Sequence, residues 1–343
     1  MRKLLNTLYV TREDVFLALD GENVVIKVES EVIARFPLHT LEGIVSFSYL
    51  GASPALIGKC ADNGIGFSFC TPQGRFLARC EGRHIGNVLL RREQHRIADD
   101  PLRCGSIASA FLFGKVFNAK WVLERGIRDH ALRIDTEKLK AASERLQKSL
   151  YVLRETIEID SLRGVEGNAA SAYFGVFDQL ILRDKETFFY HERSRRPPKD
   201  ACNALLSFVY MLLANMCVNA LESFGLDSYM GFLHFDRPAR PSLALDLMEE
   251  LRPCMADRFV LTLINNRVVS PQDFEYSGTG AVFIKDNARR SLLKAWQEKK
   301  QEMIRHPFLQ EKIPWGMVPY VQAQLLSRFI RGDLEQYPPF LWK

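Results

Sequence analysis

The sequence lacks the cysteine spacing of a zinc ribbon and that of a secreted disulfide framework. Its seven cysteines are scattered along the chain, odd in number, and never form a CxxC pair. Structural zinc sites and small secreted domains need closely paired or evenly numbered cysteines. We therefore expect reduced, mostly buried thiols in a cytoplasmic protein, because a free cysteine usually packs as a small hydrophobic residue.

A long apolar run and an export signal are also missing. The longest apolar stretch, LLSFVYMLLANMCV from Leu205, is shorter than the roughly 18 residues that a membrane span requires, so it predicts a buried helix. The start, MRKLLNTLYVTRED, reaches charged residues before a signal-peptide hydrophobic region can form. We expect neither a membrane partner nor export.

What is present is an ordinary globular composition with an uneven charge distribution. The 343 residues are 47% hydrophobic and 25% charged, which favours a soluble protein of two domains. Residues 1–82 contain 8 Lys and Arg against 9 Asp and Glu, whereas the remainder contains 38 against 32. The basic excess therefore lies in the second part, where it permits a polyanionic partner. Taken singly, each local basic cluster is more simply a solvated face: Arg91–Arg92, Arg193–Lys199 and Arg289–Arg290.

The first part of the chain is predicted to be rich in β-strands. Apolar residues alternate on both sides of Asp20–Gly21, which is a strong hairpin signal. IGFSFC and RFLARC flank the turn TPQG at residues 71–74 in the same way. Between these hairpins, Ser53 and Pro54 predict the start of a short helix that ends before Gly64.

The second part shows helical periodicity from about Gly82–Gly86 onward. After the expected cap Asp135, apolar residues spaced by three, four or seven predict one face of a long helix: Leu139, Leu146, Leu150, Leu153 and Ile157. A basic, proline-broken loop leads into another helix, GTGAVFIKD predicts a short hairpin strand, and two more helical segments follow. We expect an α+β fold: a small β-rich domain over residues 1–84 and a larger, mainly α-helical catalytic domain over residues 85–343.

One charged segment, GFLHFDRPARPSLALDLMEELRP at residues 231–253, carries candidate site residues. About three turns of helix are predicted between Pro241 and Pro253. A leucine stripe is expected to face the core: Leu243, Leu247 and Leu251. Asp246 and Glu249 are three residues apart, so they are neighbours on one helical face and can converge on one point. His234 lies upstream and can reach that point only through the intervening loop.

A third acid lies far upstream in LRGVEGNAASAYFGVFDQL. Glu166 stands on a predicted helix that is otherwise mostly small and apolar. A charge in such surroundings costs free energy unless it is paired or bound to a metal, which makes Glu166 a site candidate. An acidic pair or a single histidine alone is more often structural, so it is Glu166 that makes the set informative.

Together these motifs resemble a known family, the CRISPR-associated endonucleases and integrases that insert new spacers, the first-numbered proteins of that prokaryotic system. The resemblance rests on GVEGNAASAYF, RSRRPPKDACNALLSFVY and GFLHFDRPARPSLALDLMEELRP, with support from GKVFNAKWVL and GAVFIKD, and it covers essentially the whole chain. The spread of motifs is most similar to the type I-C form.

The resemblance implies a metal site built from Glu166, His234 and Glu249. Asp246 matches an acid beside that site, which ligates directly or through water. Independently, two or three carboxylates and one imidazole suit Mg²⁺ or Mn²⁺, which act as Lewis acids on a phosphodiester. The histidine must be neutral to bind, so activity should fall as it is protonated.

The implied reaction is transesterification on double-stranded DNA. A 3′-hydroxyl of a short incoming duplex attacks a phosphodiester at the border of a CRISPR repeat, and the same site can cut branched or other DNA. Arg237 is the best candidate for a phosphate contact at the active site. Arg240, Arg195 and Arg196 are expected to grip the backbone, giving salt-sensitive binding. Tyr190 and Tyr210 could line the pocket or simply pack in the core.

The resemblance also implies partners. The β-rich domain would form a homodimer, and two such dimers would assemble on the small second-numbered CRISPR-associated protein. Two alternatives stay open: a non-catalytic DNA-binding scaffold of the adaptation complex, and a di-iron carboxylate enzyme. The second needs paired Glu-x-x-His elements, and Ala169 and Arg252 stand three residues after Glu166 and Glu249.

Overall fold

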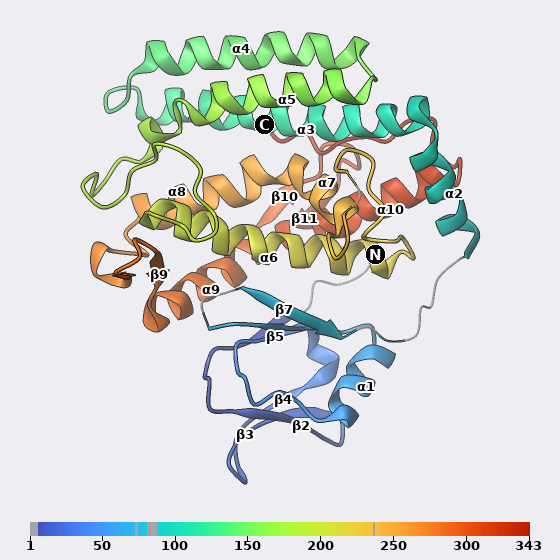
Figure 1. Cartoon of the computed structure of the whole chain (residues 1–343), viewed down its shortest axis with the longest axis vertical. Coiled ribbons are helices and arrows are strands. Elements are labelled where there is room, and N and C mark those ends of the chain that lie inside the picture. The colour runs from blue at the N-terminus through green and yellow to red at the C-terminus, as the bar shows by residue number, and fades with distance from the viewer. Residues whose placement is uncertain (1–5, 73–74, 81, 83–87, 236) are drawn as a thin grey trace. The chain divides into compact units, whose positions relative to one another are not determined.

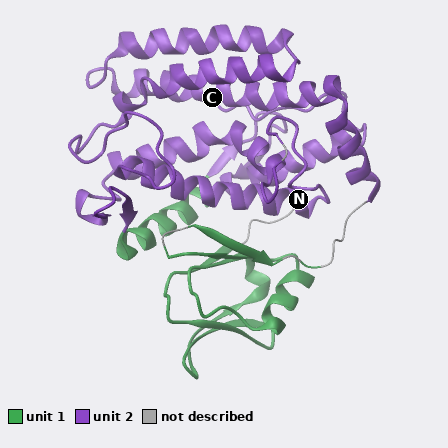
Figure 2. Cartoon of the chain, in the orientation of Figure 1, with its two compact units in different colours: residues 1–85, 285–302 green, residues 86–284, 303–343 purple. Residues whose placement is uncertain are grey.

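The structure is a computed structural model that describes residues 6–72, 75–80, 82, 88–235 and 237–343. The chain forms two compact units, drawn in different colours in Figure 2: unit 1 comprises residues 1–85 and 285–302, and unit 2 comprises residues 86–284 and 303–343. Residues 285–302, which the sequence analysis assigned to the helical domain, thus group with the β-rich unit. The expected boundary region and half of the turn TPQG, Gln73 and Gly74, fall on residues outside those described.

Unit 1 is built on two small sheets. One has the strand order β1-β5-β6-β7, with β1 (Asn6–Val10) and β6 (Gly66–Cys70) parallel to β5 (Leu41–Ser46), and β7 (Phe76–Cys80) antiparallel to β6. The other has the order β2-β3-β4, formed by β2 (Phe16–Asp20), β3 (Asn23–Val28) and β4 (Glu31–Pro37). Buried Val, Leu, Ile and Phe side chains from these strands form the core of the unit.

Local signals in unit 1 are confirmed. Strands β2 and β3 pair across a turn at Gly21, where φ is +57°, a region that glycine enters without steric cost. Strands β6 and β7 form the second hairpin. Helix α1 (Pro54–Asp62) begins after Ser53, whose hydroxyl accepts a hydrogen bond from the Leu56 amide at 3.3 Å. Helix α9 (Asp286–Gln301) completes the unit.

Unit 2 is mainly helical. Figure 1 shows its elements, whose bounds are α2 (Val88–Asp99), α3 (Pro101–His130), α4 (Thr136–Glu155), α5 (Ile159–Phe174), α6 (Ala201–Ser223), α7 (Ser242–Leu251), α8 (Arg258–Asn265) and α10 (Val318–Ile330). Two short antiparallel pairs accompany them: β8 (Phe274–Tyr276) with β9 (Val282–Ile284), and β10 (Met303–Arg305) with β11 (Lys312–Pro314). Together with unit 1 they confirm the predicted α+β fold.

The long helices of unit 2 pack so that α3 lies between two groups of elements. Helix α3 packs against α4 and α5, which run beside it in Figure 1, and also against α7. Helix α6 in turn packs against α7 and α10. By length and composition α6 could span a membrane, but 67% of its most apolar window is buried inside the protein, which identifies it as a core helix.

Two helix ends differ from the predictions. Helix α4 begins after the expected cap Asp135 but ends at Glu155, because Thr156 adopts an extended conformation; Ile157 therefore lies beyond the helix and is 40% exposed. Helix α7 lies between Pro241 and Pro253 as predicted, but Pro253 does not end the helical path. The chain continues through a π-helical segment, Arg252–Asp257, into α8.

Candidate active site

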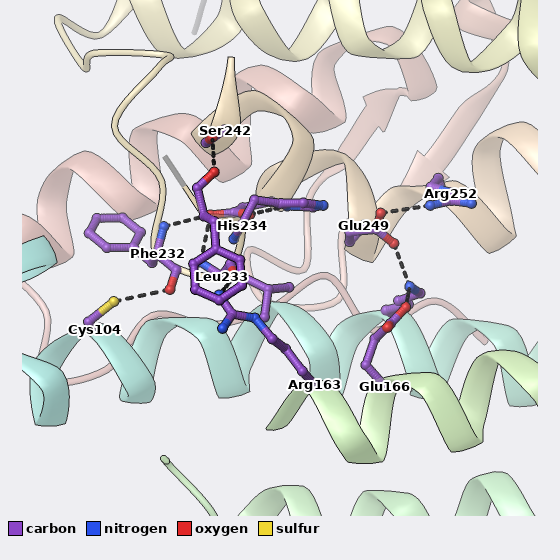
Figure 3. A network of polar contacts seen from close by, with 12 residues as sticks. Cys104, Arg163, Glu166, Phe232, Leu233, His234, Ser242, Glu249 and Arg252 are labelled. Carbon is purple, nitrogen blue, oxygen red and sulfur yellow. Dashed lines mark hydrogen bonds and ion pairs between the residues drawn. The ribbon is translucent and has the colours of Figure 1, made fainter. Parts of the chain in front are cut away.

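The acidic residues predicted from the sequence meet where α5 and α7 approach α3. Glu166 comes from α5 and Glu249 from α7. Figure 3 shows them on opposite sides of one cation, with Arg252 beside Glu249. The leucine stripe Leu243, Leu247 and Leu251 is completely buried, so the core fixes the rotation of α7 and turns Glu249 toward α3.

The cation between the two carboxylates is the ammonium group of Lys115 on α3. Its Nζ lies 2.7 Å from Oε2 of Glu249 and also forms an ion pair with Glu166. The lysine side chain is only 12% exposed. Lys115 was not predicted from the sequence, although it lies within the motif GKVFNAKWVL. Its local signal is that of a lysine in a largely apolar helical stretch.

Glu249 is buried but remains ionised. Burial alone would raise its pKa, but the charges of Arg252 and Lys115 outweigh burial and hold the pKa of Glu249 well below its usual range. Arg252 Nη1 donates to Oε1 of Glu249 at 2.7 Å. Its guanidinium also lies 4.4 Å from the ring centroid of Tyr210, which donates a hydrogen bond to Asp257. Arg252 and Asp257 were not predicted from the sequence as candidates; they belong to the polar network around Glu249 and Tyr210.

Asp246 faces the histidine loop and not the ammonium of Lys115. Its Oδ2 accepts hydrogen bonds from the backbone amides of Phe232 and Leu233 at 2.6 and 2.9 Å. Its Oδ1 accepts from the amide of His234 at 3.1 Å and lies 2.5 Å from His234 Nδ1. Asp246 is completely buried. These four contacts occupy both oxygens, so Asp246 holds the loop and orients His234.

The arrangement of His234 suits metal binding. A metal-binding histidine commonly donates its second ring N–H to a carboxylate, which fixes its tautomer and orientation. Asp246 makes this contact with Nδ1, which leaves Nε2 of His234 as the possible ligand. The two remaining predicted ligands, Glu166 and Glu249, already share one cation.

The donor set fits a divalent ion only if Lys115 is displaced. Among the residues that the structure describes, no three His, Cys, Asp or Glu side chains lie close enough together to hold a metal. In place of a metal ion, Lys115 supplies the positive charge that the carboxylates of Glu166 and Glu249 need. Oε2 of Glu249 is buried and makes no hydrogen bond of good geometry, only the ion pair, so an acceptor is available to an incoming ion.

The predicted basic residues differ in exposure. Arg195, Arg196 and Arg237 are exposed, while Arg240 is partly buried. Partial burial lowers the pKa of Arg240, and the charges of Arg237 and Arg195 lower it further, so each of these two guanidiniums lies within electrostatic reach of Arg240. The charges of Asp246 and Glu249 act on Arg240 in the opposite direction. The basic cluster therefore lies near the acidic site.

Several other basic and aromatic side chains are buried or bonded within the protein. Arg193 turns inward and donates to the side chains of Asn203 and Ser207 at 2.7 and 3.0 Å. Arg289 is 2% exposed, so it does not contribute to a basic surface. Tyr190 stacks with Phe174 in an aromatic cluster. Packing is therefore the observed role of Tyr190, one of the two possibilities left open from sequence.

Glu250, next to Glu249, has a different set of partners. It accepts hydrogen bonds from the Tyr337 hydroxyl at 2.6 Å, the Phe340 amide at 3.1 Å and the Gln322 side chain at 3.1 Å. Asn118 on α3 also bonds this segment, through the Phe340 carbonyl and the Trp342 amide, each at 2.8 Å. Burial raises the pKa of Glu250 to about 7. Residues 337–342 are thus attached to the helices that carry Lys115 and Glu249.

Comparison with known proteins gives consistent matches. Residues 8–298 match the family model described as CRISPR associated protein Cas1. The chain is 48% identical over 343 residues to a CRISPR-associated endonuclease Cas1 of Chlorobaculum tepidum, and 48% identical over 347 residues to another of Rhodospirillum rubrum. In both cases the alignment covers 100% of each chain.

Solved structures share the fold at low sequence identity. A casposase bound to an integration product has a TM-score of 0.84 and 21% identity, covering 99% of this chain and 95% of that one. A CAS1 protein from Thermotoga maritima gives 0.82 and 20%, covering 97% and 99%. A Cas6-RT-Cas1–Cas2 complex gives 0.82 and 22%, covering 100% of this chain and 36% of that one.

Proposed function

The chain belongs to the Cas1 family of CRISPR-associated proteins, and from this premise we propose that it is a divalent-metal-dependent DNA endonuclease and integrase of CRISPR adaptation. It inserts short duplex DNA into a CRISPR array as new spacers. The observation that carries the proposal is the convergence of Glu166 and Glu249 on one cation, together with a histidine, His234, that is oriented by a buried aspartate. The likeness to the type I-C form stays a prediction.

Glu166, Glu249 and His234 would hold the metal, which is Mg²⁺ or Mn²⁺ because the donors are mostly carboxylate oxygens with one imidazole. When bound, the ion supplies Lewis-acid stabilisation of charge on the phosphodiester. Asp246 keeps His234 oriented, and Arg252 keeps Glu249 ionised. Arg237, Arg240 and Arg195 contact phosphates of the DNA near the site, and Arg196 contacts the backbone further away.

The reaction exchanges one phosphodiester bond for another. The 3′-oxygen of the incoming DNA forms a bond to phosphorus as the bond to the leaving 3′-oxygen breaks. The attacking hydroxyl loses its proton and the leaving oxygen gains one. The number of phosphodiester bonds is unchanged, so the step needs no nucleotide cofactor. Water in place of the hydroxyl gives strand cleavage by the same displacement.

The partners follow from family membership. We propose that unit 1 forms a homodimer and that the dimers assemble with the small Cas2 protein on double-stranded DNA. A solved structure of similar fold is described as a Cas6-RT-Cas1–Cas2 complex, which supports the proposed association with Cas2. The net positive charge of the chain, 46 Lys and Arg against 41 Asp and Glu, favours binding to the phosphate backbone.

A strand-transfer assay tests the catalytic proposal. A labelled short duplex is incubated with a repeat-bearing plasmid in Mn²⁺, in Mg²⁺ or in EDTA. Glu166→Gln, His234→Ala and Glu249→Gln should each reduce strand transfer by at least about 100-fold, since each removes a metal ligand. Glu144→Gln, an exposed change on α4, is the matched control and should leave activity unchanged.

Duplex binding and far-ultraviolet circular dichroism of the same variants show whether they stay folded. Full strand transfer by the Glu166 or Glu249 variant, or activity of the unchanged protein in EDTA, would favour the non-catalytic scaffold. Iron retained after purification would instead support the di-iron alternative.

A further inference from the structure

An exposed aromatic side chain directly follows the proposed histidine ligand. Phe235 is 61% exposed, although the three residues before His234, Gly231, Phe232 and Leu233, are buried. An exposed apolar residue alone needs no explanation. The guanidinium of Arg163, however, lies over the Phe235 ring, 3.4 Å from the ring centroid.

Arg163 is itself held by other contacts. Its Nη2 donates to the Leu233 carbonyl at 2.8 Å, and its Nη1 pairs with Asp160 at 3.1 Å. Figure 3 shows Arg163 reaching from its helix toward the loop that carries Leu233 and His234. The Phe235 carbonyl accepts a hydrogen bond from the Ser242 hydroxyl at 3.3 Å. The ring is therefore stacked on an anchored guanidinium and its backbone is tied to the start of α7.

The stacked pair Arg163 and Phe235 lies on the same helix and loop as two of the proposed metal ligands. Arg163 lies three residues before Glu166 on α5, a rise of about 4.5 Å along the helix. Phe235 lies one residue after His234, whose orientation Asp246 fixes. Because Arg163 and Phe235 are each so close in sequence to a proposed metal ligand, we expect a nucleotide beside the reacting phosphate to reach the ring.

We propose that Phe235, backed by Arg163, is a stacking platform for one unpaired nucleobase of the DNA that reacts at the site. The inference rests on the proposed function and adds a nucleobase-binding position to it. Stacking on an aromatic ring tolerates any base, because every base has a π-face, and removing such a ring weakens binding about 5- to 150-fold. Arg163 restricts the motion of the ring and so lowers the entropy lost when a base stacks on it.

The test is a binding cycle in EDTA with a duplex that carries a single-stranded 3′ extension. A single abasic nucleotide is moved one position at a time along the extension, and the Kd is measured by fluorescence anisotropy. For the unchanged protein, one position should weaken binding by about 5- to 150-fold. Phe235→Ala should show this loss with intact DNA and no further loss at that abasic position. Phe235→Tyr should bind as the unchanged protein does.

Tyr151→Ala is the matched control, because Tyr151 is an aromatic residue on α4 that is 58% exposed. It should keep the full abasic penalty. If Phe235→Ala loses as much affinity at the abasic position as the unchanged protein, the base does not stack on Phe235 and the platform is overturned. The same result follows if no abasic position weakens binding.

The two proposals fail separately because binding is measured without metal. A protein that transfers strands in Mn²⁺ but shows no Phe235-dependent abasic penalty overturns the platform alone. A protein that shows the penalty but transfers no strand overturns the proposed chemistry alone.

Discussion

Lys115 acts as an internal counter-ion for Glu166 and Glu249. Without a cation there, the buried carboxylate of Glu249 would be poorly compensated, because within the described part of the chain its remaining ion pair is with Arg252. A divalent ion that binds the same carboxylates must displace the ammonium group. Lys115 therefore stabilises the two carboxylates in the absence of a metal and would compete with the proposed metal ion.

Replacing Lys115 with methionine tests whether its charge stabilises the metal-free protein and opposes metal binding. Lys115→Met keeps much of the side-chain volume but removes the charge, so we expect a loss on the order of 3 kcal/mol in unfolding free energy in EDTA. Mn²⁺ should raise the stability of this variant more than that of the unchanged protein, as measured by denaturant unfolding. Lys138→Met, which removes an exposed ion pair with Asp135, should cost less than about 1 kcal/mol. Equal losses in the two variants would contradict the role of Lys115.

His306 should make unit 2 sensitive to acid. The residue is completely buried, its Nδ1 accepts from the Phe308 and Leu309 amides at 3.3 and 3.2 Å, and its Nε2 lies 3.1 Å from the Gln322 side-chain oxygen. Burial lowers the pKa of His306 to about 4, so the folded protein holds the neutral form. The unfolded chain takes up a proton near pH 6.5, and stability contributed by His306 is therefore lost as pH falls from about 6.5 to 4.

The acid effect of His306 should amount to as much as about 3 kcal/mol. His306→Asn keeps an acceptor for the two amides but does not titrate. Urea unfolding at pH 7 and pH 5 should show a smaller decrease for this variant than for the unchanged protein. A decrease of the same size in both would assign the acid sensitivity to other groups.

At the level of single residues, sequence reasoning located acids and a histidine but not their positively charged partners. Glu166 stood out because its own surroundings are apolar, and Asp246 and Glu249 because helical spacing places them on one face. Lys115 also lies in a largely apolar stretch, but its pairing and that of Arg252 depend on partners brought close by the fold: Lys115 and Glu166 are 51 residues apart. The direct role left open for Asp246 could not be decided without the backbone amides that it binds.

At the level of elements, α3 and the α4–α5 connection approach so closely that one position tolerates only glycine. A Cβ atom on Gly105 would lie 1.8 Å from the Ile157 carbonyl oxygen. Because that oxygen belongs to the backbone, relief would require the connection to move away from α3.

Gly105→Ala should therefore destabilise unit 2 by several kcal/mol, in the range of overpacked cores or above it. Gly164→Ala on α5 is the control, since nothing lies within 4 Å of its added Cβ, and alanine there should stabilise the helix by about 0.5–1 kcal/mol. Thermal unfolding followed by circular dichroism measures both. Equal melting temperatures would show that the connection yields easily.

Elements with local signals were predictable and those set by distant contacts were not. The two hairpins and the helix caps at Ser53 and Asp135 follow from turn and cap chemistry within a few residues. The parallel pairing of β5 with β1 joins segments about 35 residues apart and leaves no local signature. The π-helical continuation through Pro253 was missed because proline suits both the end of one helix and the start of the next.

At the level of the whole molecule, unit 1 offers an edge suited to self-association. Strand β4 is at the edge of its sheet and pairs there with β3. Val32 and Ile33 on β4 are 47% and 46% exposed. An exposed apolar edge strand is a template for pairing with another chain, which supports the proposed homodimer.

Charges on this edge should disrupt the dimer. The double variant Val32→Lys with Ile33→Lys should shift the mass measured by light scattering from dimer to monomer, because lysine on an edge strand opposes pairing. Glu29→Lys, at the adjacent turn, adds charge without touching the apolar pair and should stay dimeric. A double variant with the mass of a dimer would place the interface elsewhere.

The attachment of residues 337–342 to α7 has a consequence during protein synthesis. Glu250 lies 87 and 90 residues before its partners Tyr337 and Phe340. At roughly 5–20 residues per second, the ribosome completes α7 several seconds before those partners exist. Until they emerge, Glu250, a buried acid next to the proposed metal ligand Glu249, lacks these donors. The helical segment around Glu250 is thus expected to reach its final packing only after residues 337–342 have been synthesised.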